Sequence, residues 1–144
     1  SLFQQYNGGK MNDVFLSAEQ KSVKKFFLQL LNIAMNEKAI SQGSFYDLQY
    51  ANYQNSDYNA HKIFSYFRAN QSEIILFVLN FGDKTEYTQI NIPDEAWNYV
   101  GASVNHTYKV VDLLENTSSE ISISNKFNCI VKPYSARILK FIIS

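Results

Sequence analysis

The sequence predicts a mostly β fold: an antiparallel, Greek-key-type β-sandwich of about eight strands, preceded by one amphipathic α-helix. From Phe45 onward, short runs of Tyr, Phe, Ile and Val alternate with clusters of Asn, Asp, Ser and Gly, as in strands joined by turns. Apolar residues at helical spacing occur only before residue 37. The chain has 144 residues and is 46% apolar, so it can bury a core without disulfides.

The predicted helix covers residues 17–36. Ser17 and Gln20 have the spacing of a capping box, which marks the first turn of a helix. The apolar residues of this segment fall on one stripe, which contains Val23, Phe26, Phe27, Leu30, Leu31 and Ala34. Lys24 and Lys25 lie away from the stripe, and we interpret them as a solvated face.

The predicted strands follow near residues 45–51, 61–69, 73–81, 85–92, 107–113, 119–124, 127–132 and 135–142. The third strand is apolar on both faces, with Ile74, Leu76 and Val78 on one side and Ile75, Phe77 and Leu79 on the other. A strand of this kind is covered on both sides. We expect one face in the sandwich core and the other under the helix or a neighbouring domain. Phe64, Phe77 and Phe81 are expected to be buried.

Charge and cysteine content exclude several classes of partner and site. Thirteen Lys and Arg residues balance thirteen Asp and Glu residues without runs of like charge, so no nucleic-acid or membrane partner is predicted. The single cysteine, Cys129, cannot form an internal disulfide or a thiolate metal cluster, and we expect it to be buried. The acids are scattered, and His61 lies far from His106. We therefore predict no catalytic residue, no metal and no cofactor.

Aromatic residues in loops are the remaining candidates for a binding site. Sugar rings stack on the flat faces of Trp and Tyr, while amides and carboxylates bind the hydroxyl groups. Trp97 and Tyr99 lie in a predicted loop, and Tyr50, Tyr53 and Tyr58 form a second group. These five residues are the predicted carbohydrate-binding positions. The alternative is that they anchor loops against the rim of the sandwich.

Five segments, taken in order, resemble the motifs of one known domain. They are AISQGSFYDLQ, KIFSYFRAN, EIILFVLNFGD, YKVVDLLENT and VKPYSARILKF, and they span most of the chain from about Ser17. Their order and content are similar to the C-terminal β-sandwich domain of the alpha-amylase family of glycoside hydrolases. The resemblance implies that residues 1–43 are the end of a catalytic (β/α)8 barrel, whose terminal helix covers about 17–36, and that residues 44–144 are the sandwich domain.

The resemblance also implies a function. In the family the sandwich packs against the flank of the barrel, so we expect a non-catalytic domain that stabilises an enzyme acting on starch- or maltodextrin-type α-glucans. Its expected partners are the barrel of the same polypeptide, α-glucan, and a second copy of the chain bound through the exposed apolar face. The family favours a secreted or periplasmic compartment, and abundant Asn, Lys, Ile and Tyr with little Arg suggest an AT-rich bacterial genome.

The catalytic acids of the family have no counterpart in this sequence. The family uses two Asp and one Glu on barrel strand ends, and Asn105-His106-Thr107 has Thr where the similar family motif has its acid. The fragment is therefore not expected to be an enzyme. Two alternatives to the stabilising role stay open: an α-glucan-binding module with an aromatic platform, and a protein-interaction sandwich with no link to sugars.

Overall fold

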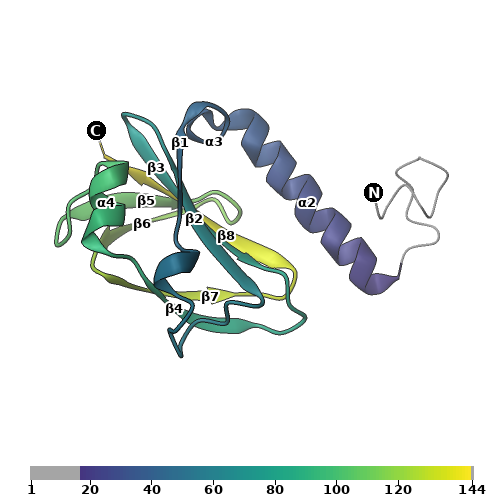
Figure 1. The fold of residues 1–144 in the computed structure, drawn as a ribbon. Coiled ribbons are helices and arrows are strands. Elements are labelled where there is room, and N and C mark those ends of the chain that lie inside the picture. The colour runs from purple at the N-terminus through teal and green to yellow at the C-terminus, as the bar shows by residue number, and fades with distance from the viewer. Residues whose placement is uncertain (1–16, 144) are drawn as a thin grey trace.

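The computed structural model describes residues 17–143, which form two β layers with a helix packed on the outer side of the larger layer (Figure 1). The helices are α2 (Ala18–Asn36), α3 (Lys38–Gln42) and α4 (Asp94–Val100). The strands are β1 (Ser44–Asp47), β2 (Ile63–Ala69), β3 (Glu73–Asn80), β4 (Glu86–Asn91), β5 (Thr107–Asp112), β6 (Thr117–Ser122), β7 (Lys126–Val131) and β8 (Ser135–Ile142), with a 3-10 turn at Gln49–Ala51. The predicted mostly β sandwich is confirmed.

The larger layer is a six-stranded sheet in the order β1-β2-β3-β8-β5-β6, and the smaller layer is the β4–β7 pair. All of the pairings are antiparallel. Every residue of β3 from Ile74 to Asn80 is buried. One face of β3 contributes Ile74, Leu76 and Val78 to the core between the layers, and the other contributes Ile75, Phe77 and Leu79 to a second core beneath α2. The sequence prediction for this strand is confirmed.

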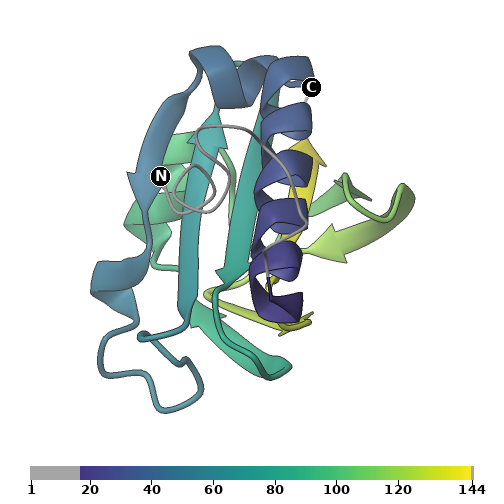
Figure 2. The same cartoon turned by 90° about the vertical axis from the view of Figure 1, so that its right-hand side faces the viewer.

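Helix α2 lies along the outer side of the six-stranded sheet, over β3 and β8 (Figure 2). Its capping box is present, because Gln20 N donates to Ser17 Oγ at 3.1 Å and Ser17 N donates to Gln20 Oε1 at 2.9 Å. Phe26 is buried, and Leu30 and Ile33 are partly buried against the sheet. The predicted stripe members Phe27, Leu31 and Ala34 have side chains outside the described part of the chain, as do residues 1–16. No helix within residues 17–143 is long and apolar enough to cross a membrane.

A buried asparagine joins the two layers at one end of the smaller sheet. Asn80, at the end of β3, donates from Nδ2 to the carbonyl oxygens of Lys84 at 2.8 Å and of Val131 and Lys132 at 3.1 Å. Its Oδ1 accepts from Gly82 N at 2.8 Å. Because its polar atoms are satisfied in the interior, Asn80 holds the end of β7 against β3.

A second buried asparagine holds the smaller sheet from its other side. Asn52 donates from Nδ2 to Leu48 O at 2.8 Å and Asn91 O at 3.0 Å, and its Oδ1 accepts from Asn91 N at 2.8 Å. Asn55 in the same loop donates to Gln89 O at 2.7 Å. The loop after the 3-10 turn therefore protects the free edge of β4.

Two expectations about local structure are wrong. Residues 94–100 form a helix instead of a loop, because Pro93 precedes it, two acids occupy its first turn, and Gly101 ends it at φ 93. Phe64 and Phe81 are 48% and 40% exposed, whereas Phe77 is buried as expected. Phe64 and Phe81 lie beside α2 on the outer side of the sheet, where the helix covers them only in part.

Candidate functional site

Trp97, the first predicted sugar-binding residue, lies in the core between the layers. Its exposed fraction is 0%, and its Nε1 donates to Ser124 O at 3.0 Å. Its ring packs on Phe67 and Phe141, with centroid distances of 5.0 Å and 5.8 Å. Contrary to the expectation, Trp97 has no ring face open to a sugar. It connects α4 to the six-stranded sheet and to the segment between β6 and β7.

Tyr58 is also part of the core, so it cannot stack on a sugar either. Its hydroxyl donates to Gln49 Oε1 and is 2.8 Å from Ser65 Oγ. Gln49 in turn donates from Nε2 to Ile63 O at 3.1 Å. Burial raises the pKa of Tyr58 to about 12, so the phenol is neutral across the physiological range.

The raised pKa of Tyr58 predicts how stability changes in alkali. Between its ordinary pKa of 10.0 and about 12, the unfolded state loses the proton that the folded state keeps. The stabilisation is complete below about pH 10 and is lost as the pH rises through about 12. In Tyr58→Phe, the free energy of unfolding should therefore fall less steeply over this window, as measured by urea unfolding. Tyr53→Phe, at an exposed position, is the matched control, and equal slopes for all three proteins would contradict the assignment.

The other three predicted tyrosines are exposed but do not form a platform. Tyr50 donates to Glu95 Oε1 at 2.9 Å and its hydroxyl is 2.6 Å from that of Tyr46, and burial with these hydrogen bonds raises its pKa. The Tyr46 ring is inclined by 65° to Tyr50 and by 45° to Tyr99. Tyr53 is 69% exposed on the following loop. Because Tyr46 is inclined to both neighbours, it does not join Tyr50 and Tyr99 into one flat surface for a sugar chain.

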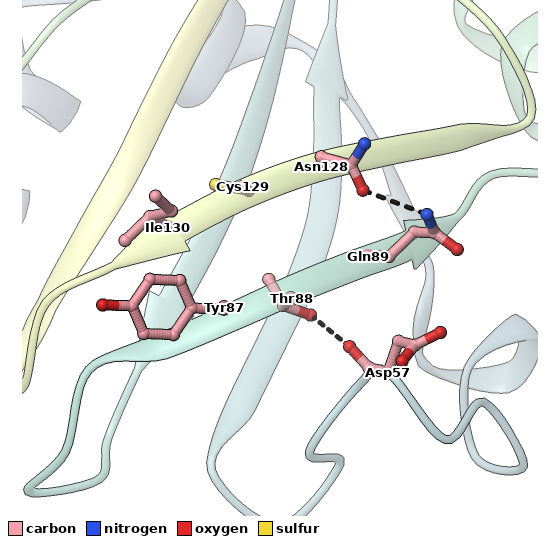
Figure 3. Close-up of a pocket in the computed structure, with 7 residues that line it drawn as sticks. All are labelled: Asp57, Tyr87, Thr88, Gln89, Asn128, Cys129 and Ile130. Carbon is pink, nitrogen blue, oxygen red and sulfur yellow. Dashed lines mark hydrogen bonds between the residues drawn. The ribbon is translucent and has the colours of Figure 1, made fainter.

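A shallow depression lies on the outer side of the smaller sheet, and the sequence analysis missed it (Figure 3). Strand pairing places Tyr87 opposite Ile130 and Gln89 opposite Asn128, and all four side chains point away from the core. Asp57 lies at the edge of β4. We call these five residues the β4–β7 face. The sequence signal for this face is the alternation of inward and outward residues along β4 and β7. The residues that alternate with the β4–β7 face are buried, and they are Thr88, Ile90, Phe127 and Cys129.

The β4–β7 face carries polar atoms that the described residues leave free. Gln89 Nε2 donates to Asn128 Oδ1 at 3.0 Å, so Gln89 Oε1 and Asn128 Nδ2 have no partner in this part of the chain. The backbone oxygen of Asp57 accepts from Gln89 N at 3.0 Å and Thr88 Oγ1 at 3.2 Å, which fixes the loop while the carboxylate makes no bond to described residues. Cys129 also lines the depression, but burial raises its pKa to about 11, so it is a neutral thiol.

A second surface lies on the outer side of the six-stranded sheet beside α2. Phe45, Phe64, Tyr66 and Phe81 form what we call the outer aromatic strip. The Phe45 and Tyr66 rings are 5.1 Å apart, Phe64 and Phe81 are 6.1 Å apart, and Phe81 is 5.6 Å from Phe26 of the helix. Phe45 is 52% exposed. The strip therefore extends the apolar surface beneath α2 toward solvent.

Arg68 lies at one end of the outer aromatic strip, where Ile40, Phe45 and Tyr66 line a depression of about 280 Å³. Its guanidinium donates to Ile40 O, in the middle of α3. Its Nε is buried and has no hydrogen-bond partner among the described residues. A buried donor without an acceptor is unfavourable by about 1–3 kcal/mol. This end of the strip therefore lacks an acceptor for Arg68 Nε among the described residues.

The alpha amylase C-terminal all-beta domain family matches residues 53–142, which is more than half of the chain. The chain belongs to this family. The alpha-amylase C-terminal domain seen here is also similar to solved structures. A maltogenic alpha-amylase from Thermotoga neapolitana is 15% identical with a TM-score of 0.58, and the match covers 91% of this chain and 28% of that chain.

Two further structures support the same fold. The alpha-amylase of Geobacillus thermoleovorans, solved with acarbose, is 12% identical with a TM-score of 0.56, and the match covers 90% of this chain and 24% of that one. An alpha-galactosidase from Mortierella vinacea is 18% identical with a TM-score of 0.52, over 94% and 31% of the two chains. This domain therefore spans less than a third of these structures. No curated protein sequence matches the chain.

The carboxylates and histidines of this alpha-amylase C-terminal domain do not form a metal site in the described part of the chain. Within residues 17–143, no group of three or more His, Cys, Asp or Glu residues is placed to hold a metal ion. The buried Asp112 pairs with Arg137 Nε at 3.0 Å and accepts from Leu114 N and Glu115 N at 3.0 Å. It caps the turn after β5, so its role is structural.

Proposed function

We propose that this chain is the non-catalytic C-terminal domain of an alpha-amylase-like glycoside hydrolase that acts on starch- or maltodextrin-type α-glucans, and that it stabilises the catalytic barrel by packing against it. In this proposal residues 1–43 are the end of the barrel and residues 44–144 are the accessory domain. The observation that carries the proposal is the outer aromatic strip, which lies directly beside the proposed last barrel helix, α2.

The chemistry of the outer aromatic strip fits a large apolar partner. Phe45, Phe64 and Phe81 are each about half exposed, and burying the remaining area contributes on the order of 1 kcal/mol per ring. Neighbouring exposed aromatic side chains of this kind are typical of interfaces. The partner should also present a carbonyl or carboxylate oxygen to Arg68 Nε, which would give this buried donor its acceptor.

The test compares one substitution in two contexts. In the full-length product of the gene that encodes this chain, Phe45→Ser or Phe64→Ser should lower the melting temperature by about 2–4 °C, while kcat on starch is unchanged before unfolding. In the isolated chain both positions are exposed, so the same substitutions should leave the melting temperature nearly unchanged and should reduce self-association in sedimentation experiments.

Tyr53→Ser, on a loop outside the strip, is the control and should have no effect in either context. Equal changes in melting temperature in the full-length product and in the isolated chain would show that the substitutions act within the domain. That result would overturn the docking role. A full-length product that contains no barrel would overturn the proposed function as a whole.

The alternative function, an α-glucan-binding module built on the tyrosines predicted from sequence, is less well supported. Trp97 and Tyr58 are buried, and Tyr50 is committed to Tyr46 and Glu95. Tyr53 and Tyr99 stay candidate positions, each without a flat neighbour from the same group. The observations favour the packing role for the domain and a different surface for sugar.

A further inference from the structure

We propose that the β4–β7 face is a carbohydrate-binding surface for a linear, neutral glucan chain. Tyr87 provides the stacking platform, and Gln89, Asn128 and Asp57 bind hydroxyl groups. The site is inferred from its own residues, whereas the choice of an α-glucan as the ligand rests on the proposed function. None of these residues belongs to the groups predicted from sequence.

Tyr87 has the properties that a stacking platform needs. It is 77% exposed, more than any other large apolar side chain among the described residues. Its cross-strand partner Ile130 is 53% exposed, so the two side chains together present a continuous apolar surface. Both stand on a strand pair that Asn80 and Asn52 hold against the rest of the fold. The platform is therefore positioned before any ligand binds.

The polar groups beside Tyr87 match hydroxyl groups. Each sugar hydroxyl both donates and accepts, so it needs neighbours of both kinds. Asn128 Nδ2 is a free donor, and Gln89 Oε1 and the Asp57 carboxylate are free acceptors among the described residues. Figure 3 shows Gln89 and Asn128 opposite each other on the two strands, to one side of the Tyr87 ring, with Asp57 on the loop next to β4. A chain that stacks on Tyr87 would pass over the amides.

The charge of the β4–β7 face favours neutral ligands over anionic ones. No Lys or Arg lines the depression, and Asp57 provides its only carboxylate. A phosphate, a nucleic acid or an acidic peptide would face this negative charge, and the exposed Lys126 on the same side of β7 lies beyond Asn128, outside the depression. The volume of the depression is about 390 Å³, near the lower end of ligand sites, which fits one or two sugar rings of a longer chain.

The site can act while the domain is docked. The side chains that alternate with the β4–β7 face point into the core between the layers, and that core separates it from the six-stranded sheet. The outer aromatic strip lies on the far side of that sheet, next to α2. A barrel bound at the strip would therefore leave the β4–β7 face open to a polysaccharide.

The test is native electrophoresis of the 144-residue chain in gels with and without soluble starch, beside an inert protein of similar size. The wild type should be retarded by starch, and Tyr87→Ala should weaken the affinity by about tenfold or more. Asn128→Ala should weaken it several-fold. Tyr53→Ala is the matched control, because it removes a tyrosine that is 69% exposed and does not line the depression, and it should bind as the wild type does. Melting curves should show that all variants are folded.

The outcomes are separable. Unchanged mobility of the wild type in both a starch gel and a β-glucan gel, or equal retardation of the wild type and Tyr87→Ala, would overturn the site. Loss of retardation in Tyr53→Ala alone would assign binding to the other tyrosines and would also overturn it. Retardation in a β-glucan gel but not in starch would overturn the choice of α-glucan. None of these results changes the melting experiment on full-length Phe45→Ser, which tests the docking role by itself.

Discussion

Replacing Trp97 by alanine is expected to lower the free energy of unfolding by about 3–5 kcal/mol, which is a large part of the stability of a domain of this size. The ring is completely buried between Phe67 and Phe141, and the substitution leaves a cavity that α4 and the two layers cannot close. It also removes the donor to Ser124 O, whose carbonyl then lies without its partner. Urea unfolding followed by circular dichroism measures the change.

Two variants separate packing from hydrogen bonding at this position. Trp97→Phe keeps most of the apolar volume and loses the Nε1 donor, so it should be less destabilising than Trp97→Ala. Tyr99→Ala lies two residues along the same helix at an exposed position, and its effect should stay below about 1 kcal/mol. A Trp97→Ala protein as stable as Tyr99→Ala would show that the ring does not support the core.

Replacing Asn80 by aspartate should have the second largest effect, a loss of about 2–4 kcal/mol near neutral pH. The substitution keeps the shape and the acceptor for Gly82 N. It places an oxygen where Nδ2 now donates to the carbonyls of Lys84, Val131 and Lys132. The introduced carboxylate would face three carbonyl oxygens in the interior, so its negative charge is strongly disfavoured.

The pH dependence of this variant provides a further check. Burial should raise the pKa of the introduced carboxyl in the folded state. As the pH falls through that raised value the carboxyl is neutralised, so the loss of unfolding free energy relative to the wild type becomes smaller. Asn98→Asp, on the exposed side of α4, is the control and should change stability by about 0.5 kcal/mol or less. A deficit that does not depend on pH would contradict the role assigned to Nδ2.

The eight strands and helix α2 could be predicted because their signals are local. Alternation of apolar and polar residues, turn residues between runs, and the Ser17 capping box are each read within a few positions of the chain. The apolar residues on both faces of the predicted strand 73–81 also indicated that both faces are buried, because apolar faces of a strand pack against other elements. The structure provides both, one from the smaller sheet and one from α2.

The sites could not be predicted in the same way, because they depend on long-range pairing. Tyr87 and Ile130 become neighbours only through the register of β4 against β7, which neither segment encodes alone. Trp97 was expected in a loop because α4 spans only seven residues, although Pro93 and Gly101 mark its ends. The exposure of Phe64 and Phe81 depends on how far α2 extends across the sheet, a property of packing and not of strand pattern.

The position of α2 has a consequence for exchanging this domain between enzymes. By sequence motif, a natural place to cut the chain is between α3 and β1, where the sandwich begins. A graft made at that junction would remove Phe26 from the sheet and leave Ile75, Phe77 and Leu79 facing water. Recombination that joins the chain upstream of Ser17 would transfer the helix together with the sheet it covers. A graft that keeps this sheet face covered therefore needs the helix as well, and chimeras cut between α3 and β1 would be prone to aggregation.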